Sequence, residues 1–201
     1  MNPNIRKKVH KIVKEVFTFT FMLICMFAAR SSFADHYFVP TGSMEYTVMP
    51  GDHLMVNKMA YGLRLPFTDI KVSDGEAVKR GEVVILDEPG SGTRLVKRAV
   101  AVGGDRISLV NGHFTINGIP LATGPYTEQF GAHIAQLNLT YGGGPNIREG
   151  IIPDGMVLVV GDNRGNSRDG RYFGLIPEQN IYARAVSVVY RSGEGLTWKK
   201  L

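Results

Sequence analysis

From Asp35 onward, apolar residues occur in short runs that are broken by glycine, proline, asparagine and aspartate. No part of this region carries a sustained 3.6-residue period, so the pattern is typical of strands. The pairs Asn111-Gly112 and Asn117-Gly118 predict tight hairpins, because both central residues of a type I′ turn need positive φ. The region is therefore predicted to be mainly β, with strands over residues 53–58, 82–86, 95–102, 106–110, 113–116, 156–160 and 183–190.

The 201 residues are enough for one domain with a real core. We assign that domain to residues 35–201. Between residues 121 and 149 the sequence becomes looser, with the run Gly142-Gly143-Gly144-Pro145 and few strand-like stretches. We interpret this part as a loose insertion or flexible subdomain, within about residues 106–155. The sequence contains no internal repeat and no nucleotide-binding fingerprint.

The N-terminal region combines a basic tail, residues 1–11, with an apolar run. Five basic residues against Glu15 give residues 1–15 a net charge of +4, out of +5 for the whole chain, which argues against a nucleic-acid partner. The run Val16–Ala29 is uncharged, and residues 12–33 would span roughly 33 Å as a helix, enough for a transmembrane anchor. The alternative is a cleavable secretory signal that ends at Ala34.

Both interpretations keep the N-terminus cytoplasmic and export the rest of the chain. Cys25, the only cysteine, lies inside the apolar run. An intrachain disulfide is therefore excluded, and the exported part must be stabilised by its core alone.

The stretch Val39–Asp52, VPTGSMEYTVMPGD, holds the candidate nucleophile Ser43. A serine hydroxyl needs a neighbouring base, usually histidine or an uncharged lysine. The G-x-S-x-G motif is absent and the histidines are scattered singly, without the spacing of a metal site. Lys97 lies inside the apolar segment RLVKRAV, where burial would lower its pKa and leave a neutral base. The alternative is a lysine that reaches solvent at a strand edge.

A third polar stretch, Gly161–Gly174, reads GDNRGNSRDGRYFG and follows the apolar run MVLVV. A calcium loop fits it badly, because Arg164 would occupy a ligand position. Ser167, Asp169 and Arg171 alternate, so on an extended segment they would point the same way. A hydroxyl and an ion pair on one face would be able to orient an amine.

Three stretches in this order resemble the motifs of the bacterial type I signal peptidases, membrane-bound serine proteases with a Ser-Lys dyad. They are PTGSM with a later GD and KMAYG, then VKRAV with Gly104-Asp105, and finally GDNRGNSRDGRYFG. The resemblance implies a signal-peptidase-like β-sheet fold with a small inserted subdomain, preceded by one transmembrane helix. It implies no cofactor and no metal.

Carried over by position, Ser43 resembles the nucleophile and Lys97 the general base. Thr41 and the Ser43 N–H resemble the oxyanion donors, and Ser167, Asp169 and Arg171 resemble the supporting group. The resemblance further assigns Val39, Met44 and Val96 to shallow pockets that select Ala-x-Ala sites.

The implied partners are signal-peptide-bearing preproteins and the lipid bilayer, with a secretion or conjugation apparatus as a further partner. The implied location is the bacterial inner membrane, single-pass, with the catalytic domain on the periplasmic side.

The chain departs from the family pattern at two prolines, which are replaced by Tyr46 and Gly103. These changes put fine specificity in question. Two alternatives from other classes stay open: a self-cleaving Ser-Lys repressor, for which no DNA-binding module is evident, and a non-catalytic β-domain of a surface assembly.

Overall fold

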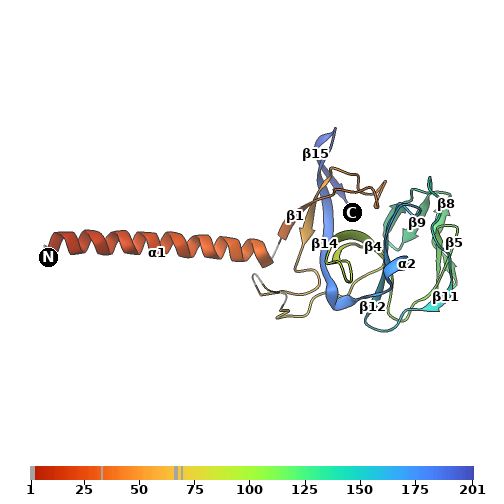
Figure 1. Cartoon of the computed structure of the whole chain (residues 1–201), viewed down its shortest axis with the longest axis horizontal. Helices are drawn as coiled ribbons and strands as arrows, with labels where there is room; N and C mark the ends of the chain where they lie inside the picture. Colours follow the sequence, from red (N-terminus) through yellow and green to blue (C-terminus); the bar gives the residue numbers. More distant parts are fainter. Residues whose placement is uncertain (1–2, 33, 66–67, 69) are drawn as a thin grey trace.

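The computed structural model describes residues 3–32, 34–65, 68 and 70–201. Figure 1 shows a β-domain from which one long helix, α1 (Pro3–Ser32), projects like a rod. The remaining helical segments are the single turn α2 (Gly170–Phe173) and the 3-10 turn η1 (Glu178–Asn180). The prediction of a mainly β domain is confirmed.

The main sheet has eight strands, and its neighbours pair antiparallel in the order β1-β2-β14-β3-β4-β12-β13, with β15 added beside β14. Of its strands of five or more residues, β1 and β15 were not expected from the sequence, and the others were. The bounds are β1 Ala34–Phe38, β2 His53–Asn57, β3 Val83–Asp87, β4 Arg94–Val102, β12 Met156–Val160, β13 Ile176–Pro177, β14 Ile181–Arg191 and β15 Gly195–Lys200.

Strand β3 shows why this sheet is stable. Its side chains alternate, and both faces are covered: Val83 and Ile85 pack into one apolar cluster, while Val84 and Leu86 pack into another. A strand that is buried on both faces reads as a continuous apolar run, which is how VVIL appears in the sequence. Strand β4 pairs with β3 along its length, with Lys97 opposite Val84. The candidate base therefore lies in the interior of the sheet.

Two smaller sheets form the other side of the domain. One has the order β11-β5-β6-β7 and contains both predicted hairpins, where Asn111, Gly112, Asn117 and Gly118 all have positive φ. The other has the order β10-β9-β8. The bounds are β5 Arg106–Val110, β6 His113–Ile116, β7 Ile119–Pro120, β8 Ala122–Gly124, β9 Thr127–Phe130, β10 His133–Gln136 and β11 Ile147–Ile151.

The interpretation of residues 121–149 as a loose region with few strands was wrong. Strands β8, β9 and β10 lie in it, and Phe130, Ala135 and Leu137 are buried in the apolar cluster that also holds Leu109 and Phe114. The strands are only three or four residues long, so no extended alternating pattern announces them in the sequence. Their order comes from packing against the neighbouring sheet.

The transmembrane segment expected at residues 12–33 stays a prediction. Residues 12–32 are helical, but among the described residues no helix is both long enough and apolar enough to cross a membrane.

Candidate active site

Ser43 lies in the loop that joins β1 to β2. Hydrogen bonds close this loop at its base, from the Val39 N–H to the Asp52 carbonyl (2.9 Å) and from the Gly51 N–H to the Val39 carbonyl (2.8 Å). Lys97, from the middle of β4, extends to this loop, and its Nζ lies 2.5 Å from Ser43 Oγ in a hydrogen bond. The structure therefore brings together the two residues that the sequence analysis selected.

The environment of Lys97 favours the neutral amine. Only 2% of the residue is exposed, which excludes the solvent-reaching lysine considered above. Burial lowers the pKa of Lys97 to about 8, although the carboxylates of Asp169 and Asp162 act in the opposite direction. A lysine with this pKa is partly deprotonated at neutral pH and is able to accept a proton from a hydroxyl.

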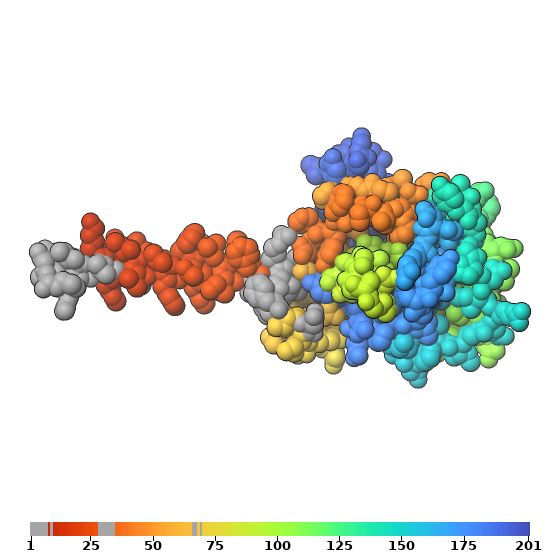
Figure 2. Space-filling view, viewed as in Figure 1, coloured from red at the N-terminus to blue at the C-terminus, as the bar shows by residue number. Residues whose placement is uncertain are grey.

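The stretch that follows β12 holds the backbone around Ser43. The Asn163 N–H donates to the Ser43 carbonyl at 3.1 Å, and Asn163 Nδ2 donates to the Gly42 carbonyl at 3.0 Å. Gly161 lies so close that a Cβ on it would be 2.4 Å from the Ser43 carbonyl oxygen and 2.2 Å from Ser167 Oγ. Only glycine permits this approach. In Figure 2 the orange loop segment, a yellow-green segment and the blue segment that follows β12 adjoin one another on the same face.

Asp169 and Arg171 form a buried ion pair, with Arg171 Nε 2.8 Å from Asp169 Oδ1. Asp169 also accepts a hydrogen bond from the Gly161 N–H at 2.9 Å. Burial alone would raise the pKa of Asp169, but the Arg171 guanidinium and the Gly161 amide hold that pKa below its usual range. The carboxylate is thus kept ionised and attached to the end of β12.

The expected reason for this grouping was wrong, because the segment is not extended. Asp169 caps the short helix α2 and accepts a hydrogen bond from the Arg171 N–H. Ser167 Oγ is buried and makes no hydrogen bond of ordinary geometry among the described residues, although it lies near enough to Asp169 to lower the pKa of that carboxyl. A hydrogen bond between Ser167 Oγ and the Lys97 amine is likewise absent within the part of the chain that the structure describes.

A second buried ion pair, Arg98–Asp162, was not predicted from the sequence. Its shortest distance is 2.7 Å, and Thr47 Oγ1 donates to Asp162 Oδ2 at 2.5 Å while accepting from Arg98 Nη2 at 3.1 Å. The three residues come from the Ser43 loop, β4 and the post-β12 stretch, so they join the three motifs. Each lies within one of the three motifs, and Arg98 directly follows Lys97; this membership of the motifs was the available signal.

The residues expected to line the substrate pockets lie in one apolar cluster. Val39 and Met44 are buried in it, and Val96 packs half-buried against it. Thr41, the expected oxyanion donor, is exposed two residues before Ser43. The described residues contain no group of three or more histidine, cysteine, aspartate or glutamate side chains that would be able to hold a metal ion.

Glu45 and Asn138 are two further residues that sequence reasoning missed. Glu45 Oε2 accepts hydrogen bonds from Asn138 Nδ2 at 3.1 Å and from Asn163 Nδ2 at 3.2 Å. These bonds attach the Ser43 turn to the segment after β10. No sequence signal links the two, because they are 93 residues apart.

A buried lysine amine against a serine hydroxyl, on a β-sheet scaffold, has the chemistry of a serine hydrolase with a lysine base. Comparison with known proteins agrees with this class. A family model described as "Signal peptidase, peptidase S26" matches residues 12–190. A "Signal peptidase I" from Pseudomonas aeruginosa is 30% identical over 222 residues, covering 93% of this chain and 76% of that protein.

A "Probable signal peptidase I-1" from Synechocystis is 31% identical over 164 residues, covering 82% of this chain and 75% of the relative. Among solved structures, a signal peptidase I from Enterococcus faecalis V583 matches with a TM-score of 0.38 and 23% identity, over 61% of this chain and 97% of that one. That structural likeness is too weak to carry an argument. The family match and the relatives suffice: the chain belongs to the signal peptidase family, peptidase S26, and is a hydrolase.

Proposed function

We propose that this chain removes N-terminal signal peptides from exported preproteins, with Ser43 as nucleophile and Lys97 as general base. The observation that carries the proposal is the 2.5 Å contact between Lys97 Nζ and Ser43 Oγ, made by an amine whose pKa is lowered by burial to about 8. A neutral amine at this distance is able to take the hydroxyl proton as the oxygen attacks.

The reaction is an acyl transfer in two stages. Lys97 takes the proton of Ser43, whose Oγ bonds to the carbonyl carbon after the small −1 residue. As the C–N bond breaks, the Lys97 ammonium gives its proton to the departing amine. Lys97 then takes a proton from a water molecule whose oxygen attacks the acyl carbon. The ester bond to Ser43 breaks, Lys97 returns the proton to Ser43 Oγ, and the signal peptide leaves with a free carboxylate.

The neighbouring groups have supporting roles in this proposal. The Ser43 N–H and the exposed Thr41 hydroxyl would donate to the oxyanion. Asp169 and Arg171 hold the end of β12, and Ser167 fills the space beside Gly161. These residues hold the Lys97 amine and the Ser43 hydroxyl at hydrogen-bonding distance and do not themselves transfer protons.

Selection of Ala-x-Ala sites is supported by the packing around Met44. The cluster that holds Val39 and Met44 is closed, with 3% and 1% of these residues exposed, and Val96 lies at its edge. A shallow depression over such a surface accepts a methyl group, whereas a longer side chain would have to displace packed atoms. The preference for small residues would follow from this lack of space.

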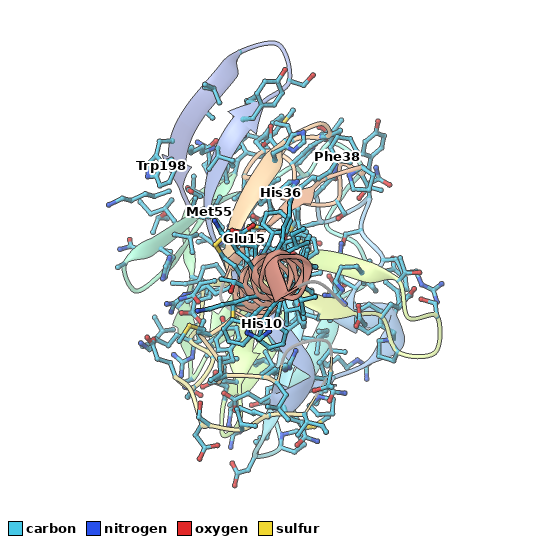
Figure 3. The ribbon with its side chains drawn as sticks, turned by 90° about the vertical axis from the view of Figure 1, so that its left-hand side faces the viewer. His10, Glu15, His36, Phe38, Met55 and Trp198 are labelled. Carbon is cyan, nitrogen blue, oxygen red and sulfur yellow. The ribbon has the colours of Figure 1, made fainter. Side chains whose placement is uncertain are left out.

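Membrane attachment is proposed for the face of the β-domain from which α1 emerges. Apolar side chains are exposed along α1 from Ile12 to Phe27. In Figure 3, which looks along α1, exposed Phe38, Met55 and Trp198 are on the face toward the viewer. Sedimentation with vesicles, compared between the full chain and residues 34–201, would measure this attachment, and protease accessibility in cells would show on which side of the membrane the domain lies.

The decisive experiment is a precursor-processing assay in detergent or lipid with wild type, Ser43→Ala, Lys97→Ala and Lys97→Arg. We expect all three variants to lose cleavage at the Ala-x-Ala site while retaining a wild-type melting temperature within a few degrees. Arginine should fail as alanine does, because a guanidinium stays protonated. Cleavage by Ser43→Ala at the wild-type rate would sink the assignment and leave a non-catalytic β-domain.

A further inference from the structure

A groove of about 430 Å³ lies beside the Ser43 turn and has no role in the steps above. It is lined by Tyr46 of the Ser43 loop, by Tyr126, by Thr127 of β9 and Gln136 of β10, and by residues 137–140 after β10. None of the lining residues carries a charge. Its volume is within the roughly 300–1,000 Å³ that is typical of ligand pockets.

The groove is continuous with the turn that carries the nucleophile. Tyr46 pairs with Leu137 in an isolated antiparallel bridge, and Leu137 lines the groove. Asn138, another lining residue, donates through Nδ2 to Glu45 Oε2 at 3.1 Å. The groove is thus lined by a residue that follows Ser43 by three positions in the chain, and a polypeptide lying across Ser43 would be able to extend into it.

The turn separates two differently packed sides. Met44 is buried in the apolar cluster with Val39, where the proposed function seats the small residues before the cleaved bond. Leu137 is buried in the other cluster, with Leu109 and Phe114 from the small sheets. An extended chain with its small residues over Met44 therefore has the Tyr46 side available for the residues that follow the cleaved bond.

We propose that this groove binds the substrate segment that follows the cleaved bond, and that it selects uncharged residues, aromatic or apolar ones included, at about +2 to +4. This inference rests on the proposed function. The exposed rings of Tyr46 and Tyr126 offer apolar faces, and the side chains of Thr127, Gln136 and Asn138 offer polar partners for a peptide backbone. A charged side chain would lose hydration there without gaining an opposite charge.

The sheet topology suits an extended occupant. Strand β10 lies at the edge of the β10-β9-β8 sheet. An edge strand is able to pair with an added peptide, which gains affinity from the main chain and selectivity from alternate side chains. The inserted segment, residues 121–149, thereby acquires a function: its β9–β10 hairpin forms one wall of a substrate groove.

The test uses three peptides with the same Ala-x-Ala sequence up to the cleaved bond. One continues with uncharged residues including tyrosine at +2 to +4, one carries three glutamates there, and one ends in an amide after +1. We expect wild type to cleave the uncharged peptide with the highest kcat/KM. In Tyr126→Ala, KM for that peptide should rise about 3- to 10-fold with kcat unchanged, and the short peptide should be unaffected.

Tyr141→Ala is the matched control, because Tyr141 is 68% exposed and is not among the residues that line the groove. Should Tyr126→Ala be poorly folded, Gln136→Glu provides a second test. It should lower kcat/KM for the triple-glutamate peptide further and raise it for a peptide with lysine at +3.

The groove assignment would be overturned if wild type and Tyr126→Ala cleaved the uncharged peptide with equal KM. It would also be overturned if Tyr126→Ala lost as much kcat/KM on the short peptide as on the uncharged one. Ser43-dependent cleavage would stand in both cases. If wild type and Ser43→Ala process all three peptides alike, the proposed function itself fails.

Discussion

Burial and charge act in opposite directions on Lys97. Removing the ammonium from water lowers its pKa, whereas the carboxylates of Asp162 and Asp169 would restore the proton. Burial prevails because each carboxylate is already paired, Asp162 with Arg98 and Asp169 with Arg171. The two buried arginines thus offset the charge of the two acids that would otherwise favour the Lys97 ammonium.

The first prediction concerns the pH dependence of cleavage. In the proposed mechanism the active form has Lys97 neutral, so the fraction of this form rises as pH increases through the pKa of about 8. We expect kcat/KM to increase about tenfold per pH unit well below pH 8 and to level off above about pH 9. Initial rates on one peptide between pH 6 and 10 measure this. A flat profile over that range would remove Lys97 from its role.

The same pKa shift also makes the free energy of unfolding increase as pH rises. Between about pH 8 and 10.5 the unfolded chain retains a proton on Lys97 that the folded chain has lost. Stability therefore increases with pH across this window, and the cost of the buried ammonium is fully present below it.

At the scale of elements, the end of β12 is where the loop, β4 and α2 meet. The approach depends on Gly161, whose N–H bonds to Asp169 and whose Cα faces the Ser43 carbonyl. The sequence marked this position only as part of a glycine-rich loop. Glycine is required there because Gly161 packs against the Ser43 loop, which is far away in the sequence. The nearby Asn163–Glu45 contact, for example, joins residues that are 118 positions apart.

The second prediction is that Gly161→Ala displaces Ser43, the proposed nucleophile. A methyl group would overlap the Ser43 carbonyl and Ser167, so the loop must move by an ångström or so. We expect kcat to fall about 100-fold, since a misplacement of that size has this effect on well-oriented groups. Gly150→Ala is the control, because a Cβ there meets nothing within 4 Å and it should cleave as wild type does. Near-normal turnover by Gly161→Ala would contradict the packing argument.

Elements that were correctly predicted are those defined by local sequence. The Asn-Gly pairs fix their hairpins because positive φ is required at those residues themselves. The apolar run at β3 indicates a buried strand whatever it packs against. Strands β8, β9 and β10 carry no such signal in three or four residues, and tertiary packing alone makes them ordered.

Across the whole molecule, a buried ion pair joins the small sheets to the third motif. Arg164, in the stretch after β12, lies 2.6 Å from Glu128 of β9, and both side chains are fully buried. The Glu128 carboxylate also accepts from the Phe114 N–H of β6 at 2.6 Å. The pair links the groove-forming hairpin, the neighbouring sheet and the segment that holds Ser43.

The third prediction compares this pair with an exposed one. Glu128→Ala leaves Arg164 buried and unpaired, so we expect a loss of about 3–5 kcal/mol of unfolding free energy. Glu149→Ala breaks the Arg106–Glu149 pair, whose side chains are 61% and 63% exposed, and should cost less than about 1 kcal/mol. Urea unfolding of the two variants gives the comparison. Equal losses would mean that Glu128 does not join the sheets as described.

The sequence by itself determined the class of fold, the order of the three motifs and the pair Ser43 and Lys97, because each depends on local residue chemistry within a few positions. Only the tertiary structure decided that Lys97 is dry, that Arg98–Asp162 and Asp169–Arg171 balance charges around it, and that residues 121–149 build a groove beside the nucleophile. These outcomes depend on contacts between segments far apart in the chain, and burial and pairing across such distances have no signature in a single sequence.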